Sequence, residues 1–196
     1  MKGVAVVAQP EGRPLDSPEL WPFYEKVAEF GVPICIHPSG APKGFDALKA
    51  PYSLHGSIGR EFDLALAATR IIIGGVLEDF PDLKIVMSHL GGGLFAIKER
   101  LGLRWPASSH VTKSFEHYFG KLYFNMAGFG RGGATLECAL AAVSPSRLVF
   151  GTDYPQNYKG DGKGMKAYIE KIRGLNLDEA AIKGILEDNA AELLRL

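Results

Sequence analysis

The chain has few cysteines, no excess charge of either sign and no long apolar run. Lys plus Arg and Asp plus Glu both total 22 in 196 residues, so the formal net charge is +0, and charge gives no reason to expect nucleic acid or an anionic membrane as a partner. The two cysteines, Cys35 and Cys138, cannot build a disulfide scaffold. No window of about 18 uninterrupted apolar residues, the length of a membrane span, occurs. Since residues 4–8 also lack signal-peptide flanks, we expect a cytoplasmic protein.

Short apolar runs alternate with helical patterns along the chain. Strands are predicted at residues 4–8, 32–36, 84–88, 122–126 and 148–151, and helices near 17–30, 60–80, 94–103, 114–119, 135–143, 163–173 and 178–187. Strands buried on both faces form continuous apolar runs, so five βα units in succession predict an α/β fold with parallel strands and outer helices. A doubly wound open sheet also fits, but its G-x-G-x-x-G fingerprint is absent, because the sequence after residue 90 runs GGGLF.

Three of the predicted strands run into side chains that can bind a metal or move a proton. Residues 32–36 lead into His37, residues 84–88 into His89, and residues 147–152 into Asp153. The C-terminal ends of parallel barrel strands point into the mouth where such barrels keep their active sites. Imidazole and carboxylate are natural ligands of a divalent ion at a catalytic site. We therefore expect these three side chains to form one metal-dependent site on the strands of a (β/α)8 TIM barrel, with His37 and Asp153 as ligands and His89 as a third ligand or a general acid/base.

Each of these residues has a simpler interpretation when it is taken alone. His37 precedes Pro38 and fits a loop, Asp153 precedes Tyr-Pro and fits a turn or helix cap, and His89 can bond a backbone carbonyl. The glycines 91–93 either present free N–H groups to a substrate carboxylate or form a tight turn that lets a helix pack closely. The long insertion at residues 38–59 indicates a functional loop. The joint position of the three residues at strand ends favours the site.

The sequence around these residues resembles a known family. The segments are CIHP at 35–38, GVLEDFPDLKIVMSHLGGG at 75–93, VFGTDYP at 149–155 and ILEDNAAELL at 185–194. In this order they are similar to the amidohydrolase-related barrel proteins, and within them to the aminocarboxymuconate-semialdehyde and resorcylate decarboxylases. The resemblance covers essentially the whole chain.

The resemblance implies a role for each of the three residues. His37 and Asp153 would be metal ligands, with Asp153 also counted among the catalytic residues, and His89 would be the catalytic acid/base. The ion would be zinc, with manganese as the second choice. The family's first ligand pair, His-x-His or Glu-x-His, lies on the first barrel strand, and this sequence has no His-x-His. An eight-unit barrel takes about 250 residues. Residues 1–196 are therefore expected to be one domain, the C-terminal five of eight βα units.

The expected function is that of a metal-dependent decarboxylase acting on a small carboxylated aromatic or ring-cleavage compound. A metal-dependent hydrolase of lactones or amides would use the same residues, and a non-catalytic truncated barrel is the third interpretation. The open edges of a partial barrel recruit partner strands. We therefore expect a homo-oligomer, or pairing with a separate N-terminal segment.

Overall fold

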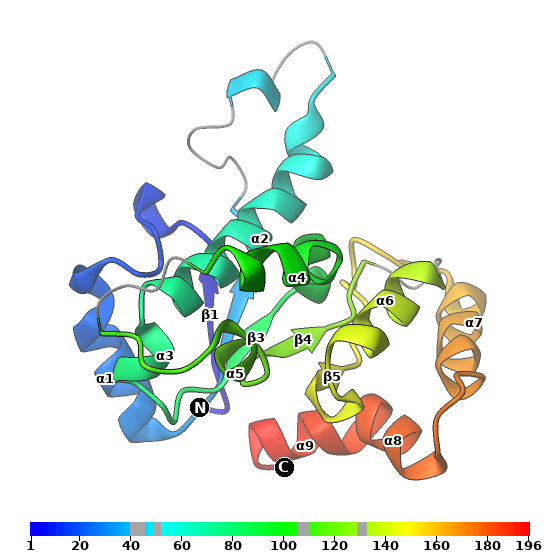
Figure 1. Cartoon of the computed structure of the whole chain (residues 1–196). Coiled ribbons are helices and arrows are strands. Elements are labelled where there is room, and N and C mark those ends of the chain that lie inside the picture. The colour runs from blue at the N-terminus through cyan, green and yellow to red at the C-terminus, as the bar shows by residue number, and fades with distance from the viewer. Residues whose placement is uncertain (40–45, 49–51, 106–109, 129–132) are drawn as a thin grey trace.

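The computed structural model describes residues 1–39, 46–48, 52–105, 110–128 and 133–196. Parts of the predicted loop at 38–59, residues 40–45 and 49–51, lie outside the described residues. Nine α-helices and five strands make up the described part, with short 3-10 segments and one π-helical turn, Gly184–Asp188, between them (Figure 1). In the described part of the chain no helix has both the length and the apolar character needed to cross a bilayer.

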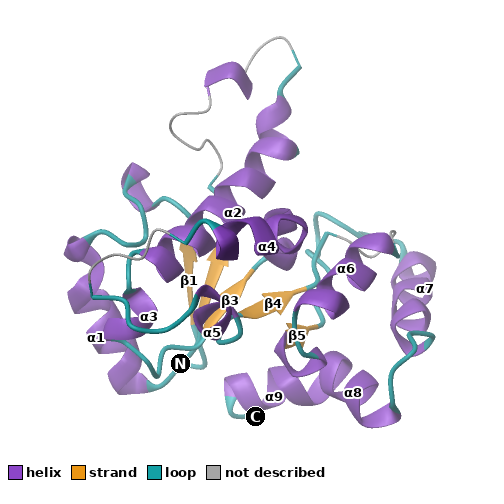
Figure 2. Ribbon diagram, in the orientation of Figure 1, coloured by secondary structure: helices purple, strands orange, loops and turns teal. Residues whose placement is uncertain are grey.

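The five strands form one parallel sheet in chain order, β1-β2-β3-β4-β5 (Figure 2). They are β1 (Val4–Val7), β2 (Ile34–His37), β3 (Ile85–Met87), β4 (Tyr123–Asn125) and β5 (Leu148–Val149). Each predicted strand is present, with slightly different bounds. A barrel adds its strands in chain order, whereas a doubly wound sheet reverses direction at a switch point. The open-sheet alternative is therefore wrong, and the sheet is part of a barrel.

The helices follow the strands as the sequence predicts, with one exception. They are α1 (Trp21–Phe30), α2 (Ile58–Ile73), α3 (Val76–Asp79), α4 (Leu94–Leu103), α5 (Phe115–Phe119), α6 (Ala134–Ala142), α7 (Gly162–Arg173), α8 (Glu179–Lys183) and α9 (Asn189–Leu194). The single helix predicted at 60–80 breaks between α2 and α3. Gly75 has a φ of +83°, and the His110 ring lies 2.1 Å from where a Cβ would stand, so this left-handed turn requires glycine.

Two clusters of apolar side chains, one large and one small, pack on the two faces of the sheet. On the outer face, α2 contributes fully buried Leu64, Ala68, Ile71 and Ile72, the stripe expected from its 3.6-residue period. Side chains alternate along a strand, so Val86 faces the other way from its neighbours and packs with Val149 and Leu193 of α9. One face of the sheet is thus buried, whereas the other is buried only around Val86 and Val149 and is exposed at Ala5 and Val7 of β1.

Candidate metal centre

The strand ends that carry the site are fixed by the hydrogen-bond ladder. His37 is the last residue of β2, and its carbonyl accepts a 2.8 Å bond from the Ala8 N–H. Ser88, just before His89, donates its N–H to the Ile36 carbonyl at 3.0 Å. These bonds extend the pairing of neighbouring parallel strands past their last residues. The positions of both histidines are therefore set by the sheet.

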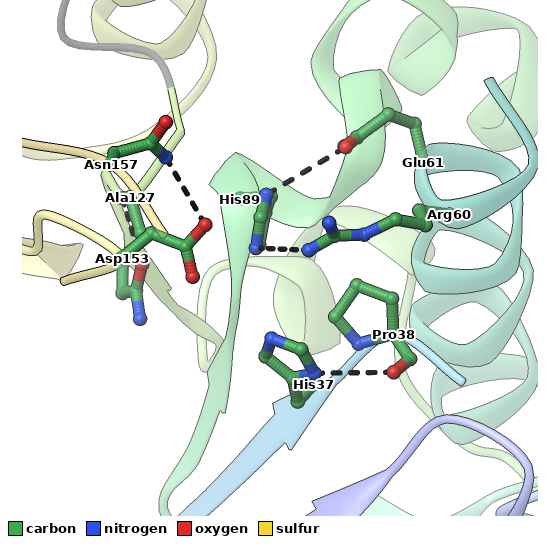
Figure 3. A network of polar contacts seen from close by, with 9 residues as sticks. His37, Pro38, Arg60, Glu61, His89, Ala127, Asp153 and Asn157 are labelled. Carbon is green, nitrogen blue, oxygen red and sulfur yellow. Dashed lines mark hydrogen bonds and ion pairs between the residues drawn. The ribbon is translucent and has the colours of Figure 1, made fainter. Parts of the chain in front are cut away.

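His37, His89 and Asp153 come together at this edge of the sheet (Figure 3). One ligand atom from each lies within 4.8 Å of the other two. The His37 and His89 rings are 5.7 Å apart between centroids, at 72°. His37 is exposed, Asp153 half-buried and His89 only 5% exposed. Two imidazoles and a carboxylate are a donor set that suits zinc or manganese, so the residues fit a divalent ion.

Two of the three residues reach the site through unusual backbone conformations. His89 has a φ of +51° and Asp153 a φ of +59°, in the left-handed region that few residues other than glycine adopt. Such conformations cost about 1–3 kcal/mol each and gather at functional sites. Here they turn each chain segment sharply where the strand has ended. The conformation therefore places both side chains beside His37.

Asp153 is held by its own loop. Asn157 donates its side-chain amide to Asp153 Oδ2 at 3.1 Å, and its N–H to the Asp153 carbonyl at 3.0 Å. His37 makes one local contact, 3.2 Å from Nδ1 to the Pro38 carbonyl oxygen. A second partner that fixes a ligand's orientation is a recurrent feature of metal sites.

Arg60 and Glu61, at the start of α2, flank the His89 ring, and sequence reasoning missed both. Arg60 Nη2 lies 3.2 Å from His89 Nε2, and Glu61 Oε1 lies 3.7 Å from His89 Nδ1. Burial lowers the pKa of His89 to about 4, with a further contribution from the Arg60 charge. The imidazole is therefore neutral at pH 7. The only sequence signal for these two residues was that they form a charged pair at the start of a helix with an apolar face.

The Glu61 carboxylate is poorly solvated. Its Oε2 is buried and has no hydrogen-bond partner among the described residues. Burial raises the pKa of Glu61 to about 7; the Arg60 charge opposes this rise and Asp153 adds to it. Beyond His89, Glu61 also lines a pocket with the apolar side chains of Phe95 and Ala96. Because these neighbours are apolar, the ionised Glu61 carboxylate is poorly stabilised by water.

The glycines 91–93 form a turn rather than the start of a helix. Their φ angles are +67°, +65° and +81°, and α4 begins only at Leu94. A Cβ on Gly92 would stand 1.9 Å from the Glu61 carbonyl oxygen. The glycines thus let α2 approach the His89 segment closely, which was one of the two expected interpretations. His55, His110 and His117 are exposed, and among the described residues none of them joins a group of potential metal ligands.

Comparison with known proteins shows the family. The profile of the amidohydrolase family matches residues 1–196. The chain belongs to the amidohydrolase family. It is 27% identical over 202 residues to 2-amino-3-carboxymuconate-6-semialdehyde decarboxylase of Dictyostelium discoideum, a match that covers 100% of this chain and 54% of that protein. The chain therefore spans about half the length of the curated relatives it matches.

Two solved amidohydrolase structures share the fold. 5-Carboxyvanillate decarboxylase from Sphingomonas paucimobilis superposes with a TM-score of 0.87 at 22% identity, over 100% of this chain and 59% of that one. Dihydroxybenzoic acid decarboxylase from Polaromonas sp., solved with manganese and the inhibitor 2-nitroresorcinol, gives a TM-score of 0.78 at 25% identity, over 92% and 55%. The predicted family and the partial-barrel fold are confirmed.

Proposed function

We propose that this chain carries metal-binding and proton-transfer residues of a metal-dependent decarboxylase that acts on a small aromatic or ring-cleavage carboxylate. The convergence of His37, His89 and Asp153 carries the proposal. Membership of a family whose matched relatives include decarboxylases of such acids supports it. Both cysteines are free, which fits the reducing cytoplasm as its location.

In this proposal His37 and Asp153 hold the divalent ion. Their donor types suit zinc, the expected ion, and manganese is present in a relative with the same fold. When bound, the ion supplies the positive charge that fixes a substrate carboxylate. Asn157 keeps the Asp153 carboxylate in position for this role.

His89 moves the proton. Decarboxylation breaks the bond between the ring carbon and the carboxylate, leaves the electron pair on that carbon and releases CO2. A proton must then reach the carbon, and His89 is the titratable group beside the proposed ligands that can deliver it. A substrate carboxylate close to the ring would favour the protonated imidazole, which the free site disfavours.

A metal-dependent hydrolase is the second candidate. The lowered pKa of His89 keeps the imidazole neutral, which is the state that accepts a proton from an attacking water. The products separate the two reactions. Release of CO2 from resorcylate or carboxyvanillate supports the decarboxylase, and cleavage of a lactone or amide without CO2 supports the hydrolase.

Metal analysis combined with turnover tests the residue roles. We expect His37→Ala and Asp153→Ala to lose bound zinc or manganese, and His89→Ala to keep the metal while turnover falls by at least about 100-fold. His117→Ala, at an exposed histidine, is the matched control and should change neither. Loss of metal in His89→Ala would make His89 a ligand. A chain that binds no metal at all would favour the non-catalytic interpretation.

We also propose that the chain assembles with further copies of itself. Within the described sheet, β1 and β5 each pair on one side only. All four residues of β1 are apolar, and yet Val7 at its end is 41% exposed. Exposed apolar edges recruit partner strands. Sedimentation of the purified chain should show a dimer or larger species, and a stable monomer with a cooperative melt would contradict this.

A further inference from the structure

We infer that Arg60 and Glu61, two neighbours on α2, fix which nitrogen of His89 carries the proton, and that Glu61 is a positioning residue for His89. The hydrogen would sit on Nδ1 and point at Glu61, and Nε2 would keep its lone pair. The part of this inference that concerns catalysis rests on the proposed function, whereas the position of the proton in the resting protein does not.

The first step comes from the chemistry of arginine. A guanidinium group has N–H donors and no acceptor. Arg60 Nη2 lies 3.2 Å from His89 Nε2, within hydrogen-bond distance. Nε2 must therefore be the acceptor, and a neutral imidazole with an accepting Nε2 carries its hydrogen on Nδ1.

The second step identifies the partner of that hydrogen. Glu61 Oε1 is the carboxylate oxygen paired with Nδ1, at 3.7 Å, which is an ion-pair distance and slightly longer than a hydrogen bond. The other oxygen, Oε2, is buried and has no hydrogen-bond partner among the described residues. A buried carboxylate oxygen that is left unpaired destabilises the folded protein. The interaction of Oε1 with the Nδ1–H group offsets part of the energetic cost of burying this carboxylate.

The third step concerns how firmly the groups are held. The Glu61 backbone lies against Gly92, where a Cβ would come within 1.9 Å of the Glu61 carbonyl oxygen. Gly128 packs on the ring, since a Cβ there would stand 2.9 Å from His89 Nδ1. Of the residues that the structure describes, His37 and Asp153 also face the ring. The ring is therefore confined in an orientation that keeps Nδ1 toward Glu61.

The consequence is an assignment of atoms. Nε2 is the nitrogen that takes up and gives back the proton, while the Nδ1–H bond stays intact. When Nε2 is protonated, the imidazolium gains the Glu61 carboxylate as its counter-charge. Removing partners that orient a histidine in this way typically costs about 10- to 100-fold in activity.

The test reads the tautomer directly. The full chain, labelled with 15N at histidine and kept free of metal with a chelator, is studied at pH 7 by long-range proton–nitrogen NMR, which separates a protonated ring nitrogen from one with a lone pair. We expect His89 to carry its hydrogen on Nδ1. A hydrogen on Nε2 in the unaltered chain would overturn the inference outright.

Variants then separate Glu61 from general effects on α2. Arg60→Ala/Glu61→Ala removes both neighbours, and in it the Nδ1–H form should lose its dominance. Glu61→Ala alone leaves Arg60 donating to Nε2 and should lower the share of the Nδ1–H form, whereas Glu61→Gln keeps an acceptor oxygen and should leave that share unchanged. Phe62→Ala, at the next and 51% exposed position, is the matched control and should leave the tautomer unchanged. An unchanged share of the Nδ1–H form in a folded Glu61→Ala protein would show that Glu61 does not position the ring.

This readout needs neither metal nor turnover, so it can fail or succeed independently of the proposed decarboxylase activity. Where turnover is measured, Glu61→Gln should lower kcat about 10- to 100-fold with little change in KM. An unchanged kcat together with an unchanged tautomer in Glu61→Ala would limit Glu61 to a packing role.

Discussion

The site is assembled from two regions that are supported in different ways. His37 and His89 stand at strand ends, where bonds between neighbouring strands fix the backbone. Arg60 and Glu61 stand at the start of α2, outside the sheet, and the backbone of this part of α2 lies against Gly92 in the His89 segment. The strand ends thus place His37, a proposed ligand, and His89, the proposed acid/base, while the helix determines the electrostatic surroundings of His89. The two regions can therefore be perturbed separately.

A substitution at Gly92, where the two regions touch, should give the largest change in stability. In Gly92→Ala the new Cβ would meet the Glu61 carbonyl oxygen at 1.9 Å, at a residue with a φ of +65°. Neither backbone can move without separating α2 from the His89 segment. We expect a loss of about 3 kcal/mol or more in the free energy of unfolding, measured by denaturant titration.

Gly93→Ala is the matched control for that variant. Gly93 has a φ of +81°, but the space that a Cβ would occupy is open, with nothing within 4 Å beyond its chain neighbours. It should therefore show only the cost of the left-handed conformation, about 1 kcal/mol. Equal losses in the two variants would mean that the contact with Glu61 contributes nothing to stability.

The pH dependence of stability tests the opposite pKa shifts of Glu61 and His89. The folded-state pKa of Glu61, about 7, lies above its ordinary 4.5, so its contribution to stability falls as pH rises from about 4.5 to 7. The folded-state pKa of His89, about 4, lies below its ordinary 6.5, so its contribution falls as pH drops from about 6.5 to 4. In the metal-free protein the two slopes oppose each other.

Glu61→Gln removes the contribution of Glu61 to the pH dependence of stability and leaves that of His89. Its free energy of unfolding should rise by about 1–3 kcal/mol between pH 4 and 6.5, and the variant should be more stable than the unaltered chain above pH 7. Denaturant titrations across this range with a chelator present measure both curves. Glu99→Gln, at an exposed glutamate, is the control and should follow the unaltered curve. Parallel curves for Glu61→Gln and the unaltered chain would rule out an electrostatic role for Glu61.

These two regions also mark what the sequence could and could not predict. The strands and the residues His37, His89 and Asp153 were predictable, because a buried parallel strand is a continuous apolar run and its end is a fixed place in the fold. Arg60 was visible only as the start of a helix. Its approach to His89 depends on how α2 packs across the chain, which no local pattern encodes. The break at Gly75 likewise depends on a tertiary contact with His110.

The smallest expected effect lies at the second proposed ligand, Asp153, where support comes from a loop side chain rather than from the sheet. Asn157→Ala removes the 3.1 Å bond to Asp153 Oδ2 and leaves the carboxylate in place. Because only its orientation is freed, affinity for Mn²⁺ or Zn²⁺ should fall about 10-fold in calorimetric titration, much less than in Asp153→Ala. Thr152→Ala removes a contact with the Tyr154 N–H in the same loop and should leave the affinity nearly unchanged. Equal affinity losses in Asn157→Ala and Thr152→Ala would show that the loop as a whole, and not the amide of Asn157, holds Asp153 in position.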